Sequence, residues 1–177
     1  SPYAASKASS DHLIRAWNKT YNFPSIITHC SNNYGSHQNY EKFIPKIIIN
    51  AINNRKIPIY GSGRQLREWI HVSDHVNALL HVSIKGKIGE TYNIGSNIVK
   101  ENIFVAKAIC KRLNKIYNNK NKNYEDLIEY VEDRPGHDFK YALNISKIKK
   151  QLNWSPKISF NEGLNQTIEW YLKESKK

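Results

Sequence analysis

The 177-residue sequence has few of the residues that mark several protein classes. Its two cysteines, Cys30 and Cys110, lie far apart and outside any CxxC pair, so neither a disulfide scaffold nor a metal site is predicted. There is no methionine, and no run of 18 apolar residues that would predict a membrane span. No basic head followed by an apolar stretch opens the chain, so no secretory signal is visible and a cytoplasmic location is expected.

Acidic residues are also scarce. Fifteen Asp and Glu stand against 27 Lys and Arg, which gives a formal charge of +12. Such a charge suits nucleic acid or a polyanionic substrate. The lysines are spread along the chain instead of forming one block, and no nucleic-acid motif is present, so no nucleic-acid partner is expected. The 40% hydrophobic and 24% charged residues are close to globular averages and exclude a disordered chain.

Apolar residues recur at helical and strand spacings. Leu13, Trp17 and Tyr21 fall four residues apart, which predicts a helix over 3–21 that ends before Pro24. The β-branched run 25–30 predicts a buried strand. Further helices are predicted at 43–52, 73–83, 103–117, 144–152 and 163–174, and further strands at 57–60, 67–71, 91–95 and 128–131. Strands alternate with helices, so the fold class is α/β.

Polar segments between these elements predict loops. Ser31–Gly35 and Asp133–Asp138 are expected to be loops, and Asn118–Asn123 a solvated, mobile linker. Gly61–Gly63 predicts the turn between two strands. A capping box at Ser159–Glu162 predicts the start of the last helix. In the helix at 73–83, the apolar residues are expected to be buried, namely Val76, Leu79, Leu80 and Val82.

The pair Tyr3 and Lys7 is the first candidate for chemistry. Residues four apart share one face of a helix. A free tyrosine titrates near pH 10, and a neighbouring ammonium favours its phenolate form. The next strand leads into Asn32 and Asn33, and ligands bind at the carboxyl ends of strands in open α/β sheets. The alternatives are a surface tyrosine beside a solvated lysine, and an asparagine-rich turn that needs no ligand.

Several blocks, taken in order, resemble the later part of an extended short-chain dehydrogenase/reductase. Within that superfamily the chain is most similar to the dTDP-glucose 4,6-dehydratases, from Ser1 to about Leu172. The blocks Ser31–Gly35 and Asp133–Asp138 are the most specific to nucleotide-sugar 4,6-dehydratases. The others are Ser1–His12, Glu41–Lys42, Ile44–Pro45, Pro58–Gly61, Arg67–Trp69, Gly89–Gly95 and Tyr141–Ala142.

The resemblance implies a role for each matching residue. Tyr3 would be the base that takes the sugar 4-hydroxyl proton while hydride moves to NAD⁺. Lys7 would hold the nicotinamide ribose and make Tyr3 more acidic, and Asn33 would lie at the nicotinamide end. Arg67 and Arg134 would clamp the diphosphate, because a planar guanidinium suits phosphate oxygens. The full set implied to bind the dTDP-glucose substrate is Asn32, Lys42, Pro58, Tyr60, Arg67, Asn102, Arg134 and His137.

The chain also departs from the family pattern. Ser36 replaces a usual proline, Glu68 a usual aspartate, and Phe139–Lys140 a usual pair of arginines. No Gly-rich phosphate loop occurs anywhere in the sequence, and the Asp/Glu pair that the family uses for dehydration has no match. We therefore expect that an N-terminal nucleotide-binding half was removed or lies on another polypeptide. These residues alone are then expected to be inactive and to self-associate through exposed apolar surface.

The resemblance further implies an architecture and a role for the intact protein. Residues 1–57 would end an NAD-binding Rossmann-like domain, and 58–177 would mainly form a smaller α/β lobe for the nucleotide sugar. The segments 67–83 and 103–117 could interleave with the large domain. The intact protein would be an NAD-dependent homodimeric lyase of dTDP-rhamnose and polysaccharide biosynthesis. The alternatives are an epimerase or decarboxylase of the same superfamily and a non-catalytic nucleotide-binding module.

Overall fold

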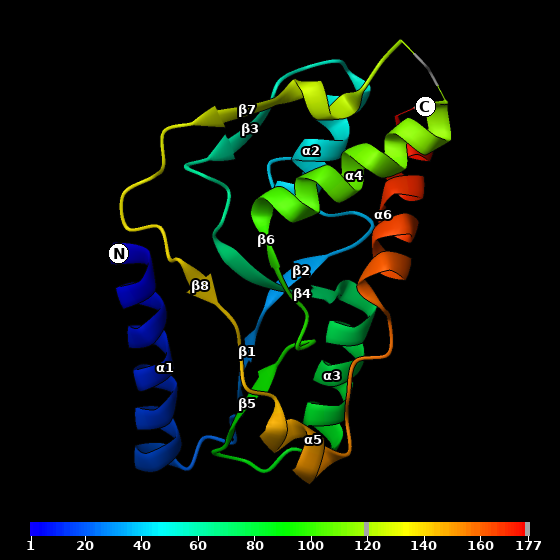
Figure 1. Ribbon diagram of the computed structural model, residues 1–177. Coiled ribbons are helices and arrows are strands. Elements are labelled where there is room, and N and C mark those ends of the chain that lie inside the picture. Colours follow the sequence, from blue (N-terminus) through cyan, green and yellow to red (C-terminus); the bar gives the residue numbers. More distant parts are fainter. Residues whose placement is uncertain (119–120, 176–177) are drawn as a thin grey trace.

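A computed structural model of the protein describes residues 1–118 and 121–175 (Figure 1). Helices and strands alternate along the chain, which confirms the α/β class. The helices are α1 (Pro2–Tyr21), α2 (Phe43–Ile52), α3 (Val72–Lys85), α4 (Asn102–Tyr117), the 3-10 helix η1 (Tyr124–Leu127), α5 (Ser146–Leu152) and α6 (Phe160–Glu174). The strands are β1 (Ile27–Cys30), β2 (Asn32–Tyr34), β3 (Ile57–Tyr60), β4 (Leu66–His71), β5 (Thr91–Ile94), β6 (Val99–Glu101), β7 (Ile128–Val131) and β8 (Lys140–Tyr141).

The strands pair mainly in parallel. β1 pairs with β5 and β3 with β7, each in parallel register over four residues. β4 is the hub of the third sheet, because it pairs in parallel with β2 and β8 and antiparallel with β6. Parallel pairs need crossover connections, and the intervening helices supply them. This pairing brings residues from widely separated parts of the chain around β4.

Three short strands were not predicted from the sequence. The segment Ser31–Gly35, predicted to be a loop, contains β2, and β6 and β8 were not predicted at all. Each has only two or three residues and exists because it pairs with β4. A run that short carries no periodic signal of its own, so tertiary pairing decides its conformation.

Helix ends mostly follow their local sequence signals. Ser1 Oγ accepts the Ala4 N–H at 3.3 Å and caps α1, whose last turn ends at Asn22 in the left-handed conformation. Ser159 Oγ accepts the Glu162 N–H at 3.3 Å, as the capping box predicts. Asn144 Oδ1 accepts the Ser146 N–H, although Ile145 holds the N-cap position of α5. The linker predicted at 118–123 includes residues 119–120, which lie outside the described residues.

Two hydrophobic clusters form the core. The larger lies between β4, α2, α4 and α6, and the smaller lies between α3, α5 and β5. Both draw on residues before and after position 57, so the domain boundary predicted there stays a prediction. Across the described ranges, no helix is both long and apolar enough to span a lipid bilayer.

The buried face of α3 differs from the prediction. Val82 is buried as predicted, but Val76, Leu79 and Leu80 are exposed. The helix instead buries Asp74, Ala78 and Val82, which repeat every four residues along one face. Asp74 Oδ2 accepts the N–H groups of Lys157 and Ile158 at 3.1 and 2.9 Å, so a carboxylate anchors this face to the segment before α6. Apolar patterning alone therefore selected the wrong face.

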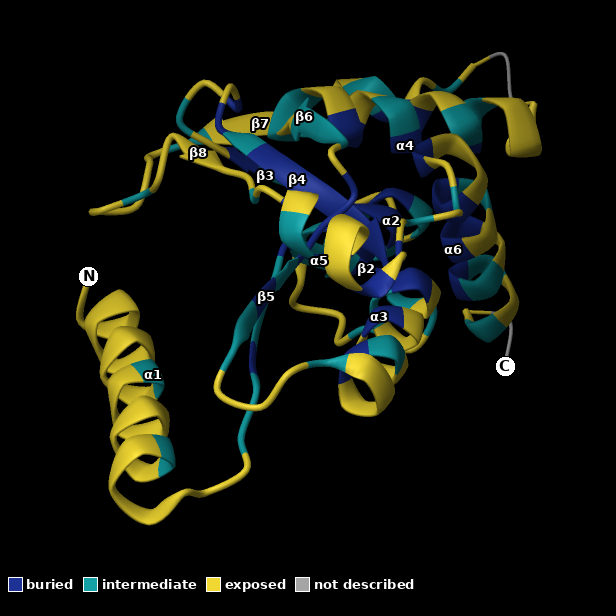
Figure 2. Ribbon diagram, turned by 90° about the horizontal axis from the view of Figure 1, so that it is seen from below, coloured by how far each residue is buried: buried dark blue, intermediate teal, exposed yellow. Residues whose placement is uncertain are grey.

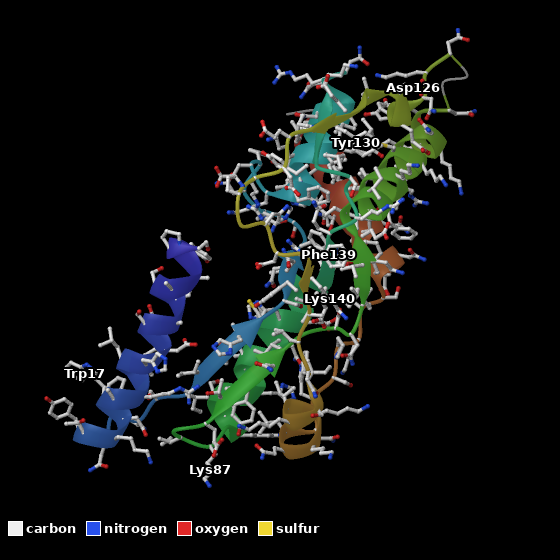
Figure 3. The ribbon with its side chains drawn as sticks, turned by 60° about the vertical axis from the view of Figure 1, so that its left-hand side comes forward. Trp17, Lys87, Asp126, Tyr130, Phe139 and Lys140 are labelled. Atoms are coloured by element: carbon white, nitrogen blue, oxygen red, sulfur yellow. The ribbon has the colours of Figure 1, made fainter. Side chains whose placement is uncertain are left out.

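Helix α1 stands apart from both clusters (Figure 2). None of its residues is buried by the described part of the chain. Trp17 is 56% exposed and extends from the outer side of the helix (Figure 3). The Asp11 carboxylate lies 2.6 Å from His29 Nε2 on β1, and Arg15 Nη2 donates to Thr91 Oγ1 on β5 at 2.8 Å. Polar contacts with the β1–β5 pair therefore position α1.

Candidate functional site

One cavity of about 330 Å³ lies where β3, β4, α2 and α4 meet, and we call it the central pocket. Elements far apart in sequence contribute to its wall, from β2 near the start to the β7–β8 loop near residue 135. Eight of its twelve lining residues are the whole set that the sequence implied for a substrate: Asn32, Lys42, Pro58, Tyr60, Arg67, Asn102, Arg134 and His137. The structure therefore brings this set together, while the role of each residue stays a prediction.

An aromatic pair forms one wall of the central pocket. The rings of Phe43 and Trp69 stack with centroids 5.9 Å apart and planes inclined by 25°. Phe43 opens α2, while Trp69 lies in the middle of β4, so packing between the helix and the sheet creates the wall. Trp69 is buried, and its Nε1 has no hydrogen-bond partner among the described residues. A buried N–H without a partner is costly, so a ligand acceptor reaching it would relieve that cost.

Arg67 lines the central pocket with a guanidinium held by the protein, and the residue is only 7% exposed. Its Nη1 donates to the Leu66 carbonyl at 2.8 Å, and its Nη2 donates to the Asp138 carbonyl at 2.7 Å. Burial lowers the pKa of Arg67, and Asp138 opposes this shift. The guanidinium stays charged, because an arginine in a protein is not deprotonated. β4 and the β7–β8 loop thus fix one permanent positive charge at the pocket.

Asp133 organises the loop that carries Arg134 and His137. Its Oδ1 accepts from His137 Nδ1 at 2.6 Å and from the Arg134 N–H at 2.9 Å. Its Oδ2 accepts from Gln65 Nε2 at 2.7 Å. The hydrogen bond from His137 is the main cause that holds the pKa of Asp133 below its usual value, and the Arg134 and Gln65 bonds add to it. The loop is therefore held in place by an ionised carboxylate.

The charge of the central pocket favours an anion. Its wall carries four permanent cations and the single carboxylate of Glu41, so its formal charge is 4 − 1 = +3 with His137 neutral. Glu41 and Lys42 form an exposed pair with N···O at 3.7 Å, which contributes little to binding or stability. The arrangement suits a ligand that joins a diphosphate to flat or apolar groups.

Four lining residues were missed by the sequence reasoning: Glu41, Phe43, Lys46 and Trp69. Lys46 had a usable signal, because it lies four residues after Lys42 and so on the same face of α2. Trp69 had none, since alternation along β4 predicts a buried tryptophan but not that its ring borders a cavity.

Asn33, the residue predicted for the nicotinamide end, lies outside the central pocket. Its Nδ2 donates to the Ser31 carbonyl at 3.1 Å, and the Asn33 backbone carbonyl accepts from Gln38 Nε2 at 2.9 Å. Its Oδ1 is buried and has no partner among the described residues. An orphaned acceptor at the carboxyl end of a parallel strand pair fits a cofactor that presents hydrogen-bond donors.

Tyr3 and Lys7 are not brought into the central pocket. Both are exposed, Tyr3 to 74%, and they share the first turns of α1. Tyr141 on β8 interacts electrostatically with Tyr3, and its hydroxyl donates to the Cys30 carbonyl at 3.1 Å. Burial raises the pKa of Tyr141, and Cys30, Glu68 and Tyr3 add to that shift. The contribution of Tyr3 to this shift puts the start of α1 near β8, and the catalytic role of Tyr3 stays a prediction.

Comparison with known proteins identifies the class and then the family. A dTDP-glucose 4,6-dehydratase from Bacillus anthracis, solved with NAD, superposes with a TM-score of 0.89 at 45% identity and covers 99% of this chain and 53% of that one. One from Streptomyces venezuelae gives 0.92 at 37% identity, covering 99% and 52%. The fold is therefore the Rossmann-like α/β fold of the short-chain dehydrogenases/reductases. The model described as GDP-mannose 4,6 dehydratase matches residues 1–167, and the chain belongs to that family.

Two curated relatives are identical to this chain at about half of the aligned residues. A dTDP-glucose 4,6-dehydratase from Escherichia coli is 53% identical over 175 residues, which is 97% of this chain and 48% of the relative. One from Haemophilus influenzae is 52% identical over 175 residues, 97% of this chain and 52% of that protein. The chain thus spans about half the length of the curated relatives it matches.

Proposed function

We propose that these residues supply the nucleotide-sugar pocket and the Tyr–Lys pair of an NAD-dependent lyase that converts dTDP-glucose to dTDP-4-keto-6-deoxyglucose. The observation that carries the proposal is the central pocket, whose eight predicted residues converge from six parts of the chain and whose formal charge is +3. Relatives with about half of their residues identical, which are named dTDP-glucose 4,6-dehydratases, support it.

Within this proposal, different residues of the central pocket bind different parts of the substrate. Arg67, Arg134 and His137 would hold the diphosphate, because guanidinium forks and a ring N–H donate to phosphate oxygens. The thymine would lie against Pro58 and Tyr60, beside the stacked Phe43–Trp69 wall. Asn32, on β2, would contact the substrate near the diphosphate.

Tyr3, Lys7 and Asn33 would serve the cofactor side. Tyr3 would take the proton of the sugar 4-hydroxyl, while Lys7 places a positive charge one helical turn away. The orphaned Asn33 Oδ1 would accept a hydrogen bond from NAD. NAD⁺, when bound, supplies the hydride acceptor for C4 and returns the hydride to C6. Loss of water across C5 and C6 also needs an acid and a base, and no matching Asp/Glu pair occurs in these residues.

Calorimetry with free nucleotides tests the pocket. We expect dTDP to bind more tightly than dTMP, because dTMP lacks the second phosphate, and more tightly than GDP, because a pocket shaped for a pyrimidine is small for a purine. Arg134→Gln should weaken dTDP at least about tenfold, and the exposed Arg55→Gln should not, because Arg55 lies outside the pocket. Absence of dTDP binding, or a preference for GDP, would reject the proposal.

Turnover tests the reaction. With NAD⁺ and dTDP-glucose we expect no 4-keto-6-deoxy product from these residues alone, because they contain no Gly-rich loop and no dehydration pair. Joined to a nucleotide-binding half, they should form product, and Tyr3→Phe should abolish it. Retained activity of Tyr3→Phe would remove the base assignment. A protein that binds dTDP in that joined form without any turnover would instead be a non-catalytic binding module.

The product also decides between superfamily reactions. An epimerase or decarboxylase would return a sugar that keeps its C6 hydroxyl or loses C6 as CO₂, whereas the dehydratase removes that hydroxyl as water.

A homodimer, a cytoplasmic location and a place in dTDP-rhamnose synthesis belong to the same proposal. A sedimentation measurement of the joined protein tests the dimer.

A further inference from the structure

The pair Asp133–His137 lies at the wall of the central pocket. The His137 side chain is only 6% exposed, and its ring lines the pocket. Nδ1 is 2.6 Å from Asp133 Oδ1, while Nε2 has no hydrogen-bond partner among the described residues. One ring nitrogen is thus taken by the protein, and the other is left for the pocket.

The surroundings of Asp133 fix the proton on Nδ1. An ionised carboxylate only accepts hydrogen bonds, so the nitrogen that faces it must carry a proton. Asp133 cannot turn away easily, because its two oxygens also hold the Arg134 N–H and Gln65 Nε2. The neutral imidazole therefore presents the bare lone pair of Nε2 to the pocket.

A diphosphate cannot pair with that lone pair. Phosphate oxygens are acceptors, so two acceptors would face each other at Nε2. The contact becomes favourable when Nε2 also binds a proton and the ring becomes an imidazolium between two anions, Asp133 and the ligand. The other charges at the pocket are the cations Lys42, Lys46, Arg67 and Arg134 and the carboxylate of Glu41, with the Asp138 carboxylate next to Arg67. Free carboxyl, ammonium and guanidinium groups ordinarily titrate outside the range from about pH 6 to 8.5.

We propose that Asp133 is a positioning residue that makes diphosphate binding proton-linked, because it holds His137 so that Nε2 must take up one proton when the ligand binds. This inference rests on the proposed function and adds to it a coupled proton and a reason for the Asp133–His137 pair. It gives the pocket a charge that appears with the ligand, in addition to the permanent charges of Arg67 and Arg134.

Calorimetry on the purified protein tests the inference without any substitution. The probe is the β-methyl ester of dTDP, whose diphosphate has no group that titrates near neutral pH. Heats measured at one pH in buffers of different ionisation enthalpy give the number of protons taken up. As the pH rises, uptake should approach one proton, and affinity should fall by up to about tenfold per pH unit. Zero uptake from pH 6 to 8.5 would overturn the inference.

Three variants locate the proton. His137→Gln should bind more weakly with no proton uptake, because the amide is a neutral donor. Asp133→Asn should move the onset of weaker binding to lower pH, because the imidazolium loses its carboxylate. His12→Gln, on exposed α1, should behave like the unaltered protein. Uptake that survives His137→Gln would overturn the inference and leave the proposed function standing, whereas no binding of the ester by the unaltered protein would overturn both.

Discussion

Glu68 Oε1 accepts the backbone N–H of Ser96 at 2.7 Å from inside the protein, where Glu68 is fully buried. The same oxygen accepts the Asn97 N–H at 2.6 Å, and Oε2 accepts the Leu143 N–H at 2.7 Å. One carboxylate on β4 therefore ties down the connection between β5 and β6 and the chain after β8. Because Arg67 precedes Glu68, the same strand fixes both the scaffold and a cation of the central pocket.

Replacing this carboxylate should destabilise the protein. Glu68→Gln sets an amide NH₂ donor against at least one backbone N–H donor, so the free energy of unfolding should fall by about 1–3 kcal/mol. Urea unfolding followed by tryptophan fluorescence measures the change. Glu129→Gln on the exposed face of β7 is the matched control and should change stability by less than about 0.5 kcal/mol. Equal effects of the two substitutions would contradict this account of Glu68.

Stability should fall as the solution becomes acidic. Burial lowers the pKa values of His71 and His75 in the folded protein, with Asp74 and Glu162 opposing the shift at His71. His71 Nδ1 also accepts the Ser73 N–H at 3.3 Å, which requires an unprotonated nitrogen. Below about pH 6.5 the unfolded chain therefore binds protons that the folded chain does not, and stability falls by up to about 1.4 kcal/mol per pH unit for each histidine.

Unfolding free energies at pH 7.5, 6.5 and 5.5 check this dependence. His71→Asn should remove the share of the slope due to His71 and leave that of His75, because asparagine does not titrate. The exposed His12→Asn should leave the slope unchanged. An unaltered slope in His71→Asn would show that His71 is not one of the groups responsible.

Lys46 should contribute to ligand affinity although it belongs to no recognised motif. Its ammonium lines the central pocket and has no ion-pair partner among the described residues. Lys46→Ala should raise the Kd for dTDP about threefold to tenfold at low salt, and less at high salt because ions screen a half-exposed charge. Lys56→Ala, which removes a lysine outside the pocket, serves as the control. A Kd that Lys46→Ala leaves unchanged at low salt would place this ammonium outside the ligand's reach.

Gly163 should reverse the usual ranking of helix formers. An alanine within α6 would ordinarily gain about 1 kcal/mol over glycine. A Cβ at Gly163, however, would lie 2.6 Å from Tyr34 Oη and 2.9 Å from His71 Cδ2, both on buried side chains. Gly163→Ala should therefore destabilise the protein by about 1–3 kcal/mol, whereas Asn161→Ala on the exposed face of α6 should stabilise it slightly. Thermal unfolding of both variants decides, and a higher Tm for Gly163→Ala would refute the close contact.

Apolar patterns and turn residues were sufficient to delimit several elements. α2, β3 and β7 begin and end where the sequence predicts, because apolar spacing and turn residues delimit them. Strands β2, β6 and β8 were out of reach, because pairing with β4 creates them and no local pattern encodes it. Likewise, nothing in the spacing of Val76 and Leu80 reveals that α3 buries the carboxylate of Asp74 in their place.

The residues of the central pocket were likewise predicted only in part. Motifs implied Arg67, Arg134 and six further residues, and folding gathers all of them around one cavity. Sequence reasoning did not find Trp69, because a buried ring borders a cavity only when the packing of α2 on β4 leaves space beside it. It did not find the bond between Asp133 and Gln65 either, since 68 positions separate the two residues.

The isolation of α1 changes how natural variation in this helix can be interpreted. In most helices an invariant position is explained first by packing, but no residue of α1 is buried within the described chain. Invariance of Tyr3 and Lys7 across species, with drift at Leu13 and Trp17, would point to selection for chemistry. Invariance of Leu13 and Trp17 as well would point to a further polypeptide surface lying against the helix.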